Sequence, residues 1–168
     1  TGPSVSTGNI GIGIVNPNEK LHVNGNINVP ATTASVGVYK LNGDRFLHAP
    51  GTNNTFLGRT AGNLTLTGVN NTGIGTNALQ ALTTGNQNTA VGYRALVSAQ
   101  NGTNNVALGY DALALITSGA DNVCLGTAAN RNATTSSRNI SIGSAALEFM
   151  TDDDNIAIGN QTSRYNVG

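Results

Sequence analysis

Larger and small residues alternate over three positions at seven places in the chain, each time directly before a glycine. The first position is Thr, Val or Ile, and the third is Leu, Ile or Val. Because the side chains of a strand point alternately to its two faces, this pattern predicts seven short β-strands whose larger residues are buried. The middle residue is small in six copies, which predicts that another backbone lies close to the second face. The middle residues are Phe56, Gly73, Ala90, Ala107, Cys124, Ser141 and Ala157.

The glycines after these strands recur at a fixed period, with five intervals of 17 residues and a last one of 16. An asparagine stands four residues before each of them. A short fixed period predicts one structural unit that stacks on copies of itself. The glycines are Gly58, Gly75, Gly92, Gly109, Gly126, Gly143 and Gly159, and the asparagines are Asn54, Asn71, Asn88, Asn105, Asn122, Asn139 and Asn155.

Seventeen residues are too few for the helical crossover of an ordinary parallel sheet, but they suffice for one coil of a solenoid. The sequence therefore predicts an all-β fold, a parallel β-solenoid of seven coils and roughly 30 Å length at about 4.8 Å per strand. Stacking places like residues over like, so the asparagines should form a ladder of side-chain amides. The glycine after each strand suits a left-handed or crowded backbone position. A second glycine, ten residues later in four copies, predicts a turn there (Gly68, Gly85, Gly102 and Gly119).

Three regions are expected along the chain. Residues 1–7 are polar and predict a disordered end, and residues 53–168 carry the repeat. Residues 8–52 between them predict an N-terminal β-hairpin and capping region. Two alternating apolar stretches there flank Asn16-Pro17-Asn18, and residues 30–52 are expected to cover the open edge of the first coil. The shortened last interval lies beside Asp152, Asp153 and Asp154, where we expect the last coil to be pinched.

Composition argues against several classes of protein. Eight basic residues balance eight acidic ones, so no strong field favours nucleic acid or anionic membrane. Only 10% of the residues are charged and 4% are aromatic, which is unusual for an ordinary enzyme domain. No hydrophobic run is long enough to span a membrane. A thin coil buries little by itself, and the small-residue strand face suggests that the remaining burial comes from other chains. We therefore expect a homotrimer.

Two segments resemble known families. The units NTAVGYRAL (88–96) and NVALGYDAL (105–113) resemble the coils of trimeric autotransporter adhesin heads, although those coils are shorter and serine-rich in their second half. That resemblance implies a left-handed parallel β-roll and a trimer of three rolls. Gly11-Ile12-Gly13 with EKLHVNG (19–25) resembles a segment of phage and phage-like tail-fibre proteins. Together the resemblances imply a virion-borne or extracellular fibre that reaches and binds a cell surface.

Candidate catalytic groups are few. A glycan hydrolase needs two carboxylates roughly 5–10 Å apart, and Asp121 and Asp154 share a coil position but lie two coils apart. The triple Asp lacks the oxygen spacing of a calcium loop, and His22 and His48 lack metal-ligand spacing. No metal or cofactor is expected. Cys124, the single cysteine, lies in the small-residue column and is expected to be buried and unreactive.

The best candidate for a surface site is a pair of aromatic residues that directly follow two glycines. Stacking should place Tyr93 beside Tyr110 and Arg94 beside Asp111. One interpretation is a contact between coils or between chains. The other is a binding site for sugars, because aromatic faces with hydrogen-bonding neighbours suit glycans.

The leading functional hypothesis is a structural and receptor-binding segment of a trimeric fibre, a tail fibre or adhesin without enzymatic activity. Its partners would be two further copies, neighbouring fibre domains and a surface glycan or protein. The alternatives are an ice-binding solenoid and the non-catalytic shaft of a glycan-degrading tailspike. An ice-binding face needs a regular Thr column. Here the position after the asparagine changes along the repeat as if it belonged to the core: Thr55, Thr72, Thr89, Val106, Val123, Ile140 and Ile156.

Overall fold

The chain divides into two units, Thr1–Pro30 and Ala31–Gly168. The computed structural model describes residues 4–6, 8–28 and 37–163. The region that we expected at residues 8–52 is therefore shared between the two units, and its residues 29–36 lie outside the described residues. Residues 164–168 of the expected repeat domain also lie outside them.

The first unit holds a three-stranded sheet in the order β1–β2–β3. β1 (Ser4–Ser6) pairs antiparallel with β2 (Asn9–Ile12), so these three residues differ from the disordered end expected at residues 1–7. Residues 1–3 and 7 lie outside the described residues. β2 pairs in parallel with β3 (Leu21–Val23), so the turn at residues 16–18 does not close a hairpin.

The second unit begins with a hairpin of β4 (Tyr39–Leu41) and β5 (Asp44–His48). Its two-residue turn, Asn42-Gly43, has positive φ at both positions, as hairpin turns favour. β5 then pairs antiparallel with the first strand of the repeat. The hairpin thus covers one edge of the parallel sheet, the position expected for a cap.

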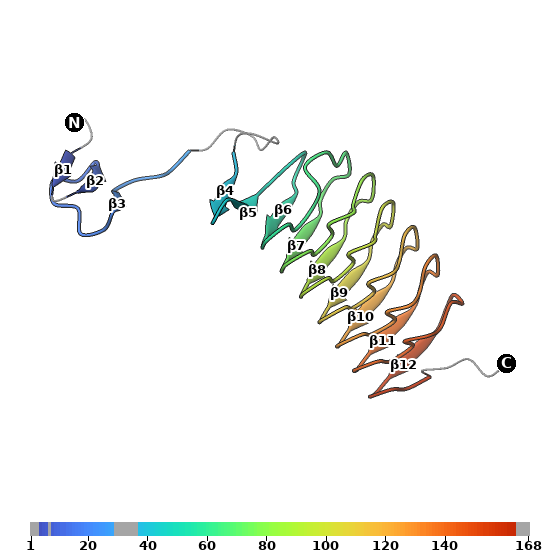
Figure 1. Ribbon diagram of the computed structural model, residues 1–168. Coiled ribbons are helices and arrows are strands. Elements are labelled where there is room, and N and C mark those ends of the chain that lie inside the picture. Colours follow the sequence, from blue (N-terminus) through green and yellow to red (C-terminus); the bar gives the residue numbers. More distant parts are fainter. Residues whose placement is uncertain (1–3, 7, 29–36, 164–168) are drawn as a thin grey trace. The chain divides into compact units, whose positions relative to one another are not determined.

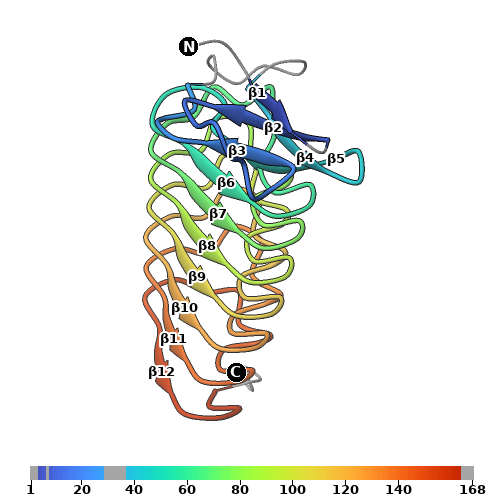
Figure 2. The same cartoon turned by 90° about the vertical axis from the view of Figure 1, so that its left-hand side faces the viewer.

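Seven strands of three residues each then stack in parallel, one per period (Figures 1 and 2). Every residue pairs with its equivalent in the next strand, and no helix occurs among the described residues. The predicted all-β parallel β-solenoid is confirmed. The strands are β6 (Thr55–Leu57), β7 (Thr72–Ile74), β8 (Thr89–Val91), β9 (Val106–Leu108), β10 (Val123–Leu125), β11 (Ile140–Ile142) and β12 (Ile156–Ile158).

We call the chain from one strand to the start of the next a coil and name it by its first strand. Seven strands delimit six coils within the described residues, rather than the seven predicted. The last of them, the β11 coil, is one residue shorter than the others, because Ile140 pairs with Ile156. The missing residue falls where the pinch was expected. Asn139 Nδ2 donates to the Asp152 carbonyl 13 residues later, whereas Asn122 Nδ2 donates to the Ser136 carbonyl 14 residues later.

The strand faces are the reverse of the prediction. The small middle residues point into the coil and are buried, and the larger residues on either side of them point outward and are partly exposed. The coil is so thin that its interior accepts only small strand residues, because the opposite wall of the same coil supplies the larger ones. The Thr/Val/Ile column therefore faces outward and is not part of the core. The argument against ice binding that treated this column as a core column is wrong.

The opposite wall fills the interior with alanine and leucine. The alanine three residues after each of the first six strand glycines is fully buried, and so is the leucine that follows it in most coils. These leucines sit at left-handed φ, for example 54° at Leu79 and 53° at Leu96. Stacking thus joins the interiors of successive coils from Phe56 to Ala133 into one long, narrow core.

Phe56 shows how one coil departs from the repeat and compensates. Its ring is fully buried, and the same coil has Gly62 where the next coil has Leu79. A Cβ at Gly62 would lie 2.5 Å from the Phe56 ring, and one at Gly73 would lie 2.7 Å from it. The ring therefore occupies the space that a leucine from the opposite wall fills elsewhere.

This exchange of volumes predicts a compensating pair of substitutions. Phe56→Ala should lower the free energy of unfolding by about 3–5 kcal/mol per chain, because it leaves a cavity. Gly62→Leu alone should also destabilise, because the new side chain overlaps the ring. The double variant should recover most of the loss, since Gly62 has a φ of 61°, close to that of Leu79. Thermal unfolding of the unaltered protein, the two single variants and the double variant measures the coupling between the two positions. If the double variant lost the sum of the two single losses in stability, this packing would be contradicted.

The predicted asparagine ladder is present and buried. Asn105 donates from its backbone N–H (3.1 Å) and from Nδ2 (3.2 Å) to the Oδ1 of Asn88. The second Nδ2 hydrogen goes to the Gly119 carbonyl, 2.8 Å away on the opposite wall. Asn122 repeats the pattern by donating to the Oδ1 of Asn105. Each amide thus bonds both to the asparagine one period before it and to a backbone carbonyl 14 residues after it.

The second column requires glycine because the backbones of neighbouring coils approach each other closely there, and not because the chain turns. None of its four members has φ in the left-handed region. A Cβ at Gly68, Gly85 or Gly119 would overlap a backbone carbonyl oxygen of the next coil, and Gly102 has slightly more room. The turn predicted at this column is therefore wrong. The corners of the coils are instead made by residues with positive φ, such as Asn104, Asp111 and Leu113 in and beside the β9 coil.

Candidate functional site

Tyr93 and Tyr110 stack on each other at the surface of the roll. Their ring centroids are 5.1 Å apart and the ring planes differ by 20°. The rings remain 42% and 54% exposed, so each keeps a face available to another molecule. The sequence prediction that stacking would bring these two residues together is confirmed. The pair is therefore at least a contact between coils.

The backbone holds the two tyrosines in register. Each directly follows the glycine of its coil, and the Asp111 N–H donates to the Tyr93 carbonyl at 3.0 Å. Thr76 and Thr127 occupy the same position in the coils before and after. These short side chains leave the outer ring faces uncrowded along the direction of stacking.

A group of charges lies beside the rings. Asp111 is only 4% exposed, and its Oδ1 lies 3.4 Å from Arg94 Nε, as the register predicted. Its Oδ2 lies 3.4 Å from Nε of Arg131, a residue that sequence reasoning missed. Arg131 stands five residues after Gly126 and so belongs to a different column of the repeat. Only the folded coil shows that this column also reaches Asp111.

The arrangement suits recognition rather than catalysis. Two partly exposed arginines meet one buried carboxylate, and Arg94 and Asp111 each directly follow one of the two exposed tyrosines in the chain. Aromatic faces pack on the apolar face of a sugar, and guanidinium groups donate hydrogen bonds to its hydroxyl or carboxylate oxygens. The asparagine and glycine columns, in contrast, lie within the wall of the roll and have a structural role.

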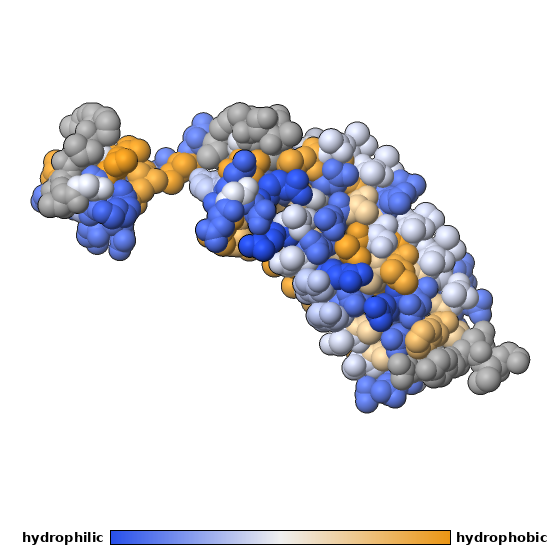
Figure 3. Space-filling model, viewed as in Figure 1, coloured by the Kyte–Doolittle hydropathy of each residue, from blue (hydrophilic) through white to orange (hydrophobic). Residues whose placement is uncertain are grey.

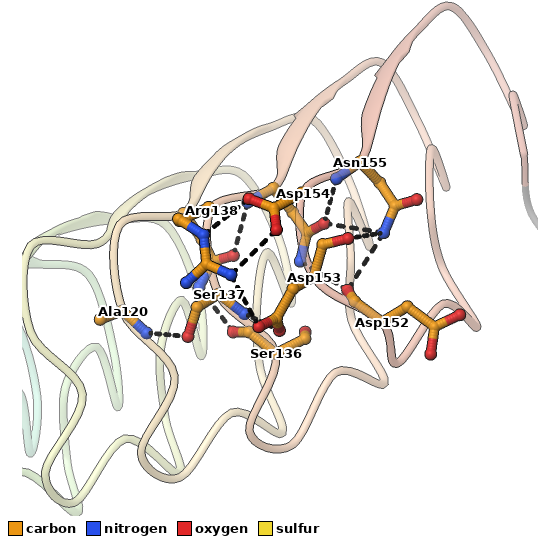
Figure 4. Close-up of polar contacts among 10 residues, drawn as sticks. Ala120, Ser136, Ser137, Arg138, Asp152, Asp153, Asp154 and Asn155 are labelled. Carbon is orange, nitrogen blue, oxygen red and sulfur yellow. Dashed lines mark hydrogen bonds and ion pairs between the residues drawn. The ribbon is translucent and has the colours of Figure 1, made fainter.

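Three other acidic residues are held by neighbouring polar groups. Asp121 accepts a hydrogen bond from Asn104 at 3.0 Å. Asp153 and Asp154 both bind Arg138 (Figure 4). The hydrogen bond from Arg138 holds the pKa of Asp154 below its usual value. Among the residues that the structure describes, no group of three His, Cys, Asp or Glu side chains is placed to hold a metal ion.

His48 and Cys124 are buried. His48 packs edge-on against the Phe56 ring with a centroid distance of 5.4 Å, and burial lowers its pKa, with a further contribution from Arg45. Burial raises the pKa of the Cys124 thiol to about 12. The thiolate is the reactive form, so this cysteine is unsuited to nucleophilic chemistry at neutral pH.

The exposed surface of the repeat is mixed in character. On the face in view in Figure 3, hydrophobic residues occur in separate patches between hydrophilic ones. The described residues contain no helix that is long and apolar enough to cross a membrane. The chain matches no known protein family model, no curated protein and no solved structure.

Proposed function

We propose that this chain is a structural and receptor-binding segment of an extracellular or virion-borne trimeric fibre, a tail fibre or adhesin. In this proposal it attaches to a glycan or protein on a cell surface. The observation that carries it is the outward-facing aliphatic side of the parallel sheet. A stack of coils with such a face is built to pack against further copies and to hold binding groups at a distance from the fibre base.

Parallel sheets are normally covered on both faces. Here the inner face is covered by the opposite wall of the coil, and the outer face carries two columns of residues. One column is aliphatic throughout, from Leu57 to Ile158, and the other changes from threonine to valine and isoleucine. Ile74 and Leu108 in the middle of the sheet are 38% and 39% exposed. This outer face replaces the small-residue face as the reason to expect a homotrimer, because the small residues are already buried within each chain.

The N-terminal unit supports the same proposal independently. Ile10 and Ile12 on β2 lie opposite Leu21 and Val23 on β3, and these side chains share one face of the sheet. Ile10, Ile12 and Leu21 are exposed. A three-stranded sheet of this size cannot cover such a face by itself and gains stability when other chains cover it.

Placing charges on the outer sheet face should separate the chains. The variant Leu108→Lys, Leu125→Lys puts two ammonium groups where two further copies would pack, so we expect a monomer that keeps the β-rich circular dichroism of the roll. The matched control, Thr84→Lys with Asn101→Lys, adds the same charge to exposed loop positions and should leave the assembly unchanged. If the two variants had the same mass in solution, the chains would pack against each other through a surface other than the outer sheet face.

Binding by the tyrosine pair is tested by Tyr93→Ala, Tyr110→Ala. Aromatic contacts contribute about 0.5–1.5 kcal/mol per ring, so losing both should weaken attachment to a glycan array or to cells by about tenfold at each site. Repetition of the site in a trimer would multiply the loss. Thr76→Ala, Thr127→Ala is the control, because it alters the same column on either side of the rings. If the tyrosine variant stays trimeric and binds as well as the control, the rings serve packing only.

The two alternatives have direct assays. Ice binding would appear as thermal hysteresis. It is disfavoured because the outward column keeps threonine only in its first three members and then becomes aliphatic. A catalytic tailspike would release reducing sugars from a surface polysaccharide, whereas its non-catalytic shaft would not; catalysis by this chain is disfavoured because Asp153 and Asp154, Asp121 and Asp111 are engaged by Arg138, by Asn104 and by two arginines.

A further inference from the structure

The core of the roll is interrupted at the junction between the β10 and β11 coils. Buried apolar residues form one cluster that extends from Phe56 to Ala133. A second, smaller cluster lies beyond it and consists of Ala146, Leu147, Met150 and Ala157. The interruption coincides with a change of residue type inside the β10 coil.

Two polar residues are buried in the β10 coil, and one of them replaces a core leucine. Asn130 stands where the β9 coil has Leu113, and Ser136 stands in the column of Gly119. Both side chains are at least 98% buried, at 0% and 2% exposure. The Ser136 hydroxyl has no hydrogen-bond partner among the described residues, and the Asn130 amide meets the thiol of Cys124, which is a weak partner. A buried polar group with no partner, or with only a weak one, destabilises the fold, so this junction is weaker inside than the others.

One backbone hydrogen bond of the neighbouring junction has no counterpart here. The asparagine ladder itself continues, because Asn155 donates from its backbone N–H at 2.8 Å and from Nδ2 at 3.0 Å to Asn139 Oδ1. Thr117 N–H donates to the Thr134 carbonyl in the next coil at 2.7 Å. Within the described part of the chain, Thr134 makes no corresponding backbone bond to the β11 coil. The strand pairing of β10 with β11 remains.

Charge joins the two coils from the outside (Figure 4). Arg138, at the end of the β10 coil, contacts Asp154 through Nε at 2.6 Å and through Nη2 at 2.9 Å. The same Nη2 lies 3.0 Å from Asp153 Oδ2. We call these three residues the Arg138 clamp. It spans the junction at which the apolar core is interrupted.

We propose that the β10–β11 junction opens as a unit: residues 140–163 separate from the rest of the roll while the coils before them stay folded, and the Arg138 clamp holds the junction closed. A solenoid has contacts only between neighbouring coils, so one weak interface is sufficient to divide it. Because the clamp is exposed, its strength depends on ionic strength and on the charge of the two carboxylates.

The charged groups around the clamp set the direction of its pH dependence. Asp152 precedes the two clamp carboxylates, and Asp121 precedes Arg138 in the same column of the repeat. The pKa of Asp154 is lowered in the folded chain by its hydrogen bond from Arg138. A lowered carboxyl pKa contributes stability above about pH 4 that is lost as the pH falls through the folded value. Opening should therefore increase on acidification below about pH 4.

Hydrogen exchange of the full chain, read by mass spectrometry, tests the proposal. Amides in residues 140–163 should show lower protection than those in residues 72–108. Arg138→Gln should lower their protection by a further two- to fivefold, about what exposed ion pairs contribute. Asn130→Leu, which restores the residue type of the other coils, should raise it by at least about fivefold. Salt at about 1 M should reproduce part of the Arg138→Gln effect.

Arg94→Gln is the matched control, because it removes another ion pair between coils where the core is continuous. It should leave residues 140–163 unchanged. Simple fraying of a terminal coil would respond to neither Arg138→Gln nor Asn130→Leu, and that result would overturn the proposal. Equal protection of residues 140–163 and 72–108 in the unaltered protein would overturn it as well.

Discussion

Replacing Gly92 with valine is expected to prevent the roll from folding. Gly92 has a φ of 136°, a region that is essentially restricted to glycine, and a Cβ there would overlap the Gly109 carbonyl oxygen in the next coil. Two independent penalties thus fall on one residue in the middle of the sheet. We expect a loss of more than about 4 kcal/mol per chain, which exceeds the usual range for single substitutions.

The control for this prediction is valine at Gly102. Its φ lies outside the left-handed region, and its nearest neighbours to a new Cβ are Asn105 Nδ2 at 3.0 Å and the Gly119 oxygen at 3.1 Å. Adjustments of a few tenths of an ångström are enough, so the cost should be about 1–3 kcal/mol. Circular dichroism during heating compares the two variants. Similar melting curves would contradict the assignment of the strand glycines as the tightest positions.

Removing one amide of the ladder should be nearly as damaging. Asn105→Ala deletes the acceptor of the Asn122 N–H and Nδ2 groups and the donor to the Gly119 carbonyl. Asn105 and Asn122 are fully buried, so these groups lose a partner inside the wall of the roll. At about 1–3 kcal/mol for each, the free energy of unfolding should fall by at least 3 kcal/mol per chain.

Two further variants separate hydrogen bonding from volume. Asn105→Asp keeps an acceptor for Asn122 but cannot donate to Gly119, and it buries a charge, so it should be at least as unstable as the alanine variant. Gln100→Ala alters an exposed side chain in the loop of the same region and should be close to neutral. If denaturant unfolding gave the same midpoint for Asn105→Ala and Gln100→Ala, the ladder would contribute nothing.

The period made the fold predictable, because seven equivalent asparagines and glycines can superimpose only in a stack of coils. The orientation of the strands was not predictable from alternation alone. Alternation distinguishes two faces, but it does not say which face meets the opposite wall. The signal was present at Phe56, whose bulk is matched by Gly62 and Gly73, and this match indicates that the middle residue is the buried one.

The corners of the coils were only partly visible in the sequence. Asn53, Asn70 and Asn104 have the residue type that tolerates positive φ, and all three adopt it. Leu79 and Leu96 adopt the same conformation with no such signal, because burial of their side chains outweighs the backbone cost.

The candidate site, like the fold, was only partly predictable from the sequence. Register alone placed Tyr93 beside Tyr110 and Arg94 beside Asp111, because these pairs share columns. Arg131 could not be found by that route, since it reaches Asp111 across columns and its position depends on the path of the loop.

The mass of the protein in solution is the most direct test of the proposed assembly, on which the proposed function rests. Light scattering coupled to size exclusion at low micromolar concentration should give three times the chain mass of 17.0 kDa. The outer sheet face and the N-terminal aliphatic face would then both be covered by other copies. A stable, folded species of 17.0 kDa would show that these faces remain exposed in solution, and it would contradict the trimeric fibre.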